Sequence, residues 1–146
     1  MKIRDIMTRD VQTVAPADTI RRAAQMMDAL NVGVLPVCDG AKLVGMVTDR
    51  DITVRATSAG LAPDACTVAE VMTDGPRYCY EDDSVSEVTR LMAGQQIRRV
   101  PVVDHNDALI GIVSLGDLAL DAKDTGAVND ALERISTPAE PDRSGQ

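Results

Sequence analysis

An internal repeat spans most of the 146-residue sequence and constrains its fold more than any other feature. Met7 and Met72 are 65 positions apart, and each follows an acidic and an aliphatic residue and precedes a threonine. Gly45 and Gly111 are 66 positions apart, so the second copy has one additional residue between its methionine and its glycine. A register kept over half of a chain, with one slip in a turn, predicts two copies of one supersecondary unit.

Both copies predict the same elements: a short helical entry segment, an extended piece, a helix, a β-hairpin and a second helix. In the first copy these are Ile3–Thr8, Val11–Val14, a helix capped by Asp18 or Thr19, the hairpin Val34–Val47 and a helix from Thr48. In the second copy they are Val68–Thr73, Arg77–Tyr80, a helix capped by Ser84, the hairpin Val100–Val113 and a helix from Ser114. The expected inner faces are Ile20, Ala23, Ala24 and Met27 in the first long helix, and Val85, Val88 and Met92 in the second.

The expected organisation is therefore α+β (α/β), with repeats at residues 1–60 and 61–122. A C-terminal helix is expected at 123–136 and a disordered tail at 137–146, where the chain is rich in proline and polar residues. Val128, Leu132 and Ile135 form an apolar stripe on that last helix, which could dock onto a partner.

Each copy contains the pattern Gly, two apolar residues, a hydroxyl residue, two variable residues and Asp, at Gly45–Asp51 and Gly111–Asp117. We interpret it as a buried strand that runs into the start of a helix. The hydroxyl can cap the helix, and free backbone N–H groups at such an end attract anions such as phosphate. The pattern thus predicts paired nucleotide half-sites, although Thr48-x-x-Asp51 and Ser114-x-x-Asp117 also fit plain helix caps.

Composition argues against several classes of partner. The net charge is -8 and there is no basic run, so a nucleic-acid backbone is not an expected ligand. Aromatic residues make up only 1% of the chain, which leaves little for stacking on single-stranded bases. No apolar run approaches the roughly 20 residues that a membrane helix needs. Three widely spaced cysteines and no recognisable signal peptide favour a reducing cytoplasm.

Residues for catalysis or metal binding do not form a recognisable set. His105 is the only histidine and lies in a polar turn, and the cysteines form no Cys-x-x-Cys pair. No nucleophile–base pair can be assembled from the spacing. Asp51 and Asp117 belong to different copies, which argues against an acid–base pair. We therefore expect no enzyme, no metal site and no catalytic residue.

The two βαββα-like copies, each with a Pro-Val strand and the Gly-to-Asp pattern, resemble a pair of CBS domains, also called a Bateman module. Val47–Asp51, which reads Val-Thr-Asp-Arg-Asp, is particularly typical. The resemblance covers residues 1–120, and the chain is similar to small stand-alone bacterial CBS-pair proteins of signal transduction and stress response. It implies two repeats packed about a pseudo-twofold axis, ligand clefts between them and a homodimer.

The resemblance also implies roles for particular residues. Asp51 and Asp117 are the candidates for contacting a ribose, and Thr48 and Ser114 for contacting ribose or phosphate. Basic residues at three further positions are phosphate candidates, namely Arg50, Arg98 and Arg99. The first copy has Gly33-Val34 where the second has Arg98-Arg99, so we expect the two clefts to differ in charge.

The function implied is regulatory binding of an adenosine nucleotide, with AMP, ADP, ATP or NAD as the ligand and no cofactor required. The alternative is a ligand-free module for dimerisation or for binding and regulating another protein. A response to an adenosine-compound panel would separate the two.

Overall fold

The computed structural model describes residues 1–121. This part of the chain forms two compact units, each described here by itself. The first-motif unit, which contains Thr48–Asp51, comprises Asp10–Tyr78 and Val103–Ile110. The second-motif unit, which contains Ser114–Asp117, comprises Met1–Arg9, Cys79–Val102 and residues 111–121. The helix predicted at 123–136, its apolar stripe and the tail predicted at 137–146 lie outside the described residues.

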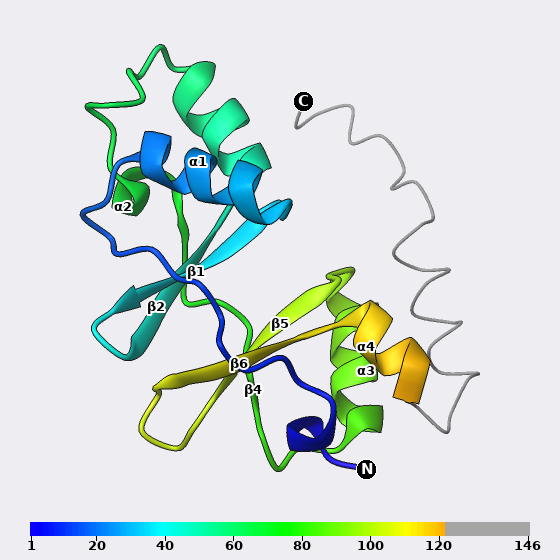
Figure 1. The fold of residues 1–146 in the computed structure, drawn as a ribbon. Coiled ribbons are helices and arrows are strands. Elements are labelled where there is room, and N and C mark those ends of the chain that lie inside the picture. The colour runs from blue at the N-terminus through cyan, green and yellow to red at the C-terminus, as the bar shows by residue number, and fades with distance from the viewer. Residues whose placement is uncertain (122–146) are drawn as a thin grey trace. The chain divides into compact units, whose positions relative to one another are not determined.

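The elements confirm a mixed helix and strand fold with two three-stranded sheets (Figure 1). The first-motif unit holds α1 (Ile20–Leu30), β1 (Val34–Asp39), β2 (Lys42–Thr48), η2 (Asp51–Thr57), α2 (Val68–Val71) and β3 (Thr73–Asp74), in sheet order β1-β2-β3. The elements of the second repeat, with the N-terminal segment, are η1 (Ile3–Asp5), β4 (Cys79–Tyr80), α3 (Val85–Gln95), β5 (Arg99–Val103), β6 (Leu109–Ser114) and α4 (Leu115–Asp121), in sheet order β4-β5-β6.

The entry segments do not stay with the repeats that follow them in sequence. Thr8 exchanges two backbone hydrogen bonds with Ile112 of β6, at 2.8 and 2.9 Å. In the same way β3, in the entry segment of the second repeat, pairs antiparallel with β2 of the first. Repeats defined along the sequence and compact units defined in space therefore divide the chain differently.

Helices α1 and α3 begin and end as equivalents. The hydroxyl oxygens of Thr19 and Ser84 each accept a hydrogen bond from a backbone N–H in the first turn. Both helices end on a left-handed residue, Asn31 at φ 54° and Gln96 at φ 53°. These caps fix where each helix begins and ends, just before β1 in one repeat and β5 in the other.

The core of each unit is aliphatic. In the first-motif unit Ile20, Ala23 and Met27 of α1 pack into one buried cluster with the strands, whereas Ala24 is exposed, so its expected place on the inner face was wrong. The half-buried Met26 packs against this cluster instead of Ala24. In α3, Val85, Val88 and Met92 are all buried, as predicted.

Two other local expectations need correction. The predicted extended piece Val11–Val14 forms only an isolated bridge, in which Val14 pairs in parallel with Val37. The helix expected from Thr48 becomes, from Asp51 to Thr57, a π-helix, with backbone bonds such as Ser58 N–H to Thr53 C=O at 3.2 Å. Periodicity alone does not distinguish this wider helix from an α-helix.

Candidate functional site: two capped strand-to-helix corners

The hydroxyl and carboxylate of each motif form a reciprocal cap. The Asp51 carboxylate accepts a hydrogen bond from the Thr48 backbone N–H at 2.9 Å, and the Thr48 hydroxyl oxygen accepts one from the Asp51 N–H at 3.0 Å. Ser114 and Asp117 repeat this arrangement at 2.9 and 3.1 Å. The capping interpretation of both motifs is confirmed, and each pair fixes the direction in which the chain leaves its strand.

Capping leaves the two carboxylates in different surroundings. The second oxygen of Asp51, Oδ1, lies 3.7 Å from Nε of Arg55, one turn further along η2, and the Asp51 side chain is 13% exposed. The Asp117 carboxylate, also half-buried, uses Oδ2 for the cap. A carboxylate oxygen has more than one lone pair, so a sugar hydroxyl can still bind to a capping Asp.

Arg98 and Arg99, which were predicted as phosphate contacts, line one pocket together with Ser114, the hydroxyl residue of the second motif. This pocket has a volume of about 400 Å³ and is lined by Arg98, Arg99, Ser114, Leu115 and Gly116. The size falls within the range of roughly 300–1,000 Å³ that is typical of small-molecule sites. Both arginines are exposed, so their guanidinium groups can move to meet an anion.

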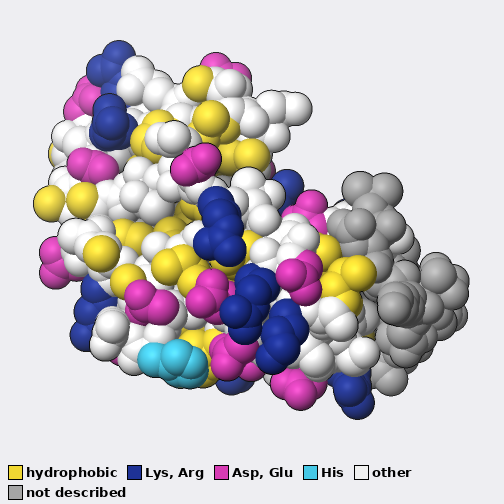
Figure 2. All heavy atoms as spheres, turned by 60° about the horizontal axis from the view of Figure 1, so that its bottom comes forward, with side chains coloured by type: hydrophobic (Ala, Val, Ile, Leu, Met, Phe, Trp, Pro, Cys, Tyr) yellow, Lys and Arg dark blue, Asp and Glu magenta, His cyan; other side chains and the backbone are white. Residues whose placement is uncertain are grey.

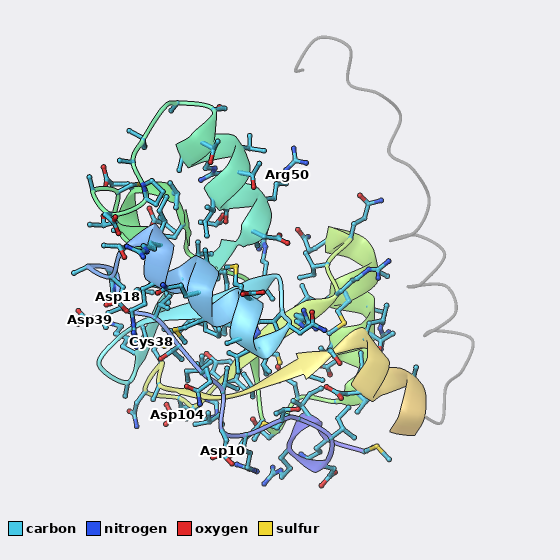
Figure 3. The ribbon with its side chains drawn as sticks, turned by 45° about the horizontal axis from the view of Figure 1, so that its top comes forward. Asp10, Asp18, Cys38, Asp39, Arg50 and Asp104 are labelled. Atoms are coloured by element: carbon cyan, nitrogen blue, oxygen red, sulfur yellow. The ribbon has the colours of Figure 1, made fainter. Side chains whose placement is uncertain are left out.

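Figure 3 shows Arg50, the third basic candidate, projecting from the start of the first-motif helix away from the ribbon. Its neighbour Asp49 is exposed as well, and the Asp49 carboxylate accepts a hydrogen bond from the Arg50 backbone N–H at 2.8 Å. Sequence reasoning did not select Asp49, although the difference between Asp49-Arg50 and Leu115-Gly116 is visible in the two motifs.

On the face drawn in Figure 2, a short row of Lys and Arg side chains near the centre is flanked by Asp and Glu side chains, so the charge of this face is mixed. In residues 1–121 no group of three or more His, Cys, Asp or Glu side chains is placed to hold a metal ion. Over the same residues no helix is both long and apolar enough to cross a membrane.

The cysteines are buried and form no disulfide. Burial raises the pKa of the Cys79 thiol to about 12, with the Asp83 carboxylate adding to the shift, and burial also raises the pKa of Cys38 and Cys66. All three are therefore protonated near neutral pH, which makes them poor nucleophiles and metal ligands.

Duplicated sheets, exchanged entry segments and paired hydroxyl–carboxylate caps define a tandem-repeat α+β module. The chain belongs to the CBS-domain family, whose model matches it twice, at residues 3–56 and 68–121. It is 42% identical over 134 residues to the CBS domain-containing protein YhcV of Bacillus subtilis. The matched region covers 92% of this chain and 94% of YhcV.

Three solved structures are also similar. A hypoxic response protein I with two coordinated zinc ions has 38% identity and a TM-score of 0.76, over 83% of this chain and 98% of that one. CBSX2 in complex with AMP has 27% identity and a TM-score of 0.74, over 83% and 95%. The CBS pair of MJ0100, bound to 5′-methylthioadenosine and S-adenosyl-L-methionine, has 30% identity and a TM-score of 0.72, over 82% and 94%. Two of these three similar proteins are therefore bound to adenosine-containing compounds.

Proposed function

We propose that this protein is a regulatory module whose second motif binds a phosphorylated adenosine compound, with AMP, ADP, ATP and NAD as the first candidates. The single observation that carries the proposal is the pocket in which Arg98 and Arg99 lie beside Ser114. Two guanidinium groups and a hydroxyl at one pocket suit a phosphate group, because arginine forms short, charge-assisted and often bidentate bonds to it. Asp117, three residues beyond Ser114, is the proposed ribose contact.

The ligand-bound relatives support the adenosine part of this proposal. CBSX2 holds AMP, and the CBS pair of MJ0100 holds two other adenosine derivatives. All three compounds share the nucleoside and differ in the group on the 5′ carbon, so the residues that meet that group decide which compound binds. In this chain Arg98 and Arg99 are those residues in the second motif.

Regulation requires that the ligand bind one arrangement of the protein better than another, since only differential affinity can shift a conformational equilibrium. No catalytic step is needed for such a role. The proposal includes a homodimer and a regulated partner protein. Sedimentation with and without ligand tests the dimer.

The test is calorimetric titration with AMP, ADP, ATP, NAD and S-adenosylmethionine at low and high salt. Replacing both arginines by Ala is expected to weaken binding of the phosphorylated compounds by about tenfold or more, because charged hydrogen bonds contribute roughly 1.5–3 kcal/mol each. Replacing Arg4 and Arg9 together by Ala is the matched control, because both are exposed and lie outside the pocket lining, and their replacement removes the same two charges. No response to the whole panel would overturn the proposal and favour the partner-binding alternative.

A further inference from the structure

Both motifs have the same backbone hydrogen bond, which joins the residue before the first strand of the hairpin to the residue after the motif hydroxyl. The carbonyl oxygen of Gly33 accepts a hydrogen bond from the Asp49 N–H at 2.9 Å, and the carbonyl oxygen of Arg98 accepts one from the Leu115 N–H at 2.8 Å. Gly33 is therefore the structural equivalent of Arg98, and Asp49 is the equivalent of Leu115. The backbones match while the charges of the side chains are opposite.

The Asp49 carboxylate fills the space in which the side chain of an arginine at position 33 would begin. A Cβ atom built on Gly33 would lie 3.0 Å from Oδ2, 3.3 Å from Cγ and 3.4 Å from Oδ1 of Asp49. The Arg50 N–H, which donates to Oδ1 at 2.8 Å, helps to hold the carboxylate there. In the first motif the negative Asp49 carboxylate thus lies next to position 33. At the equivalent position of the second motif, Arg98 carries a positive guanidinium group.

The remaining polar groups of the motifs do not cancel this difference. The reciprocal caps Thr48–Asp51 and Ser114–Asp117 have the same geometry and the same charge. Two cations lie at the first motif, and each is opposed by a carboxylate: Arg55 lies 3.7 Å from Asp51, and Arg50 is the neighbour of Asp49. The second motif has two cations and, at Leu115-Gly116, no opposing charge.

We propose, as an extension of the proposed function, that Asp49 sets the ligand charge at the first motif: it excludes phosphorylated nucleosides and leaves this half-site to nucleosides whose 5′ group is uncharged or cationic. A phosphate brought within a few ångströms of the Asp49 carboxylate meets a repulsion that the exposed Arg50 does not offset, and Arg55 is already paired with Asp51. An uncharged 5′ group avoids that repulsion, and a cationic one is attracted. One chain would then bind two chemically different nucleosides, one at each motif.

An exposed acid in the first turn of a helix also stabilises that helix without any role in binding. Asp49→Asn separates the two roles, because the amide oxygen can still accept the Arg50 N–H while the negative charge is gone. Asp49→Leu reproduces the residue of the second motif. Gly33→Arg combined with Asp49→Leu transfers both residues, and the second change removes the carboxylate that the new Cβ would contact.

The experiment is amide NMR of the full chain titrated separately with adenosine and with AMP. Amide shifts of residues 48–51 report on the first motif and those of residues 114–117 on the second. In the wild type, AMP is expected to shift the second set and adenosine the first. In Asp49→Asn the AMP affinity of the first motif should rise about 5- to 10-fold, as expected for removing one nearby surface charge, with less than a twofold change for adenosine. The gain should shrink at high salt.

The outcomes separate this proposal from the proposed function. AMP that shifts residues 114–117 while the first motif responds equally in wild type and Asp49→Asn would overturn the role of Asp49 alone. Equal gains for adenosine and AMP would do the same, because they would indicate a conformational effect. If neither motif responds to either compound in any variant, both proposals fail.

Discussion

The sulfur of Met72 lies 2.7 Å from the position that a Cβ atom on Gly45 would take, and the carbonyl oxygen of Thr73 lies 2.9 Å from it. The same contact recurs at Gly111, where an added Cβ would meet the Met7 sulfur at 3.0 Å and the Thr8 carbonyl oxygen at 2.8 Å. Each motif glycine is thus the place where an entry segment from the other repeat crosses the strand. Met7 and Met72, which reveal the repeat in the sequence, are the residues that make this crossing.

We therefore predict that Gly45→Ala and Gly111→Ala each lower the free energy of unfolding by about 1–3 kcal/mol, the usual cost of overpacking. The thioether can move aside, but the backbone carbonyl oxygen cannot do so without disturbing the strand pairing. Urea denaturation followed by circular dichroism measures the change. Gly94→Ala is the matched control: it lies within α3 with no atom within 4 Å of the added Cβ, and should stabilise the protein by up to about 1 kcal/mol. If Gly45→Ala and Gly111→Ala unfold with the same free energy as the wild type, the close approach of the entry segments to these glycines would be contradicted.

The reciprocal caps predict a loss of stability that does not depend on a ligand. Asp51→Ala removes the acceptor of the Thr48 N–H, and Asp117→Ala removes that of the Ser114 N–H, so each should destabilise the ligand-free protein by about 1 kcal/mol. Asp51→Asn and Asp117→Asn keep an acceptor oxygen and should retain most of that stability. Thermal unfolding without nucleotide provides the measurement. Alanine variants that unfold like the wild type would show that the caps do not contribute.

Cys79 makes stability fall at alkaline pH. Burial raises the pKa of its thiol to about 12 in the folded protein, above the ordinary value of 9.0. The unfolded chain loses this proton first, so the stabilisation is complete below about pH 9 and is lost as the pH rises toward 12. Between pH 7.5 and 10.5 the loss should be on the order of 1–2 kcal/mol. Cys79→Ala should show a flatter dependence, and an unchanged slope would contradict the prediction.

Glu70 has the opposite effect at acid pH. Its carboxylate accepts a hydrogen bond from the Thr67 backbone N–H at 2.6 Å and another from the Thr67 hydroxyl at 3.1 Å, and these bonds lower the pKa of Glu70 below its ordinary value of 4.5. The unfolded chain then binds the proton more readily, so this stabilisation is present above pH 4.5 and is lost as the pH falls through the folded-state pKa. The difference in unfolding midpoint between wild type and Glu70→Gln should therefore narrow from pH 7 to pH 3.5. If the difference in unfolding midpoint does not change with pH, ionisation of the Glu70 carboxylate is not the cause of that difference.

Local chemistry made much of this fold predictable. A repeat kept at a separation of 65 residues implies two similar units, and apolar spacing with Ser and Thr caps indicates α1 and α3. The hydroxyl and Asp of each motif are three residues apart, so their capping bonds follow from short-range geometry alone. Arg98 and Arg99 lie shortly before Pro101 in the sequence, and the family resemblance selected them as phosphate candidates from that position.

Only the tertiary structure decided which segments exchange between the repeats, because Thr8 and Ile112 pair across more than a hundred residues and no local pattern encodes such a pairing. It likewise decided that Arg98 and Arg99 share a pocket with Ser114, and that the Asp49 carboxylate lies over Gly33. The sequence by itself determined the two copies, their capped helices and the unequal charges of their motifs. Where those charges act depends on how the two strands of each hairpin pair, because this pairing sets Arg98 and Arg99 beside Ser114 and the Asp49 carboxylate over Gly33.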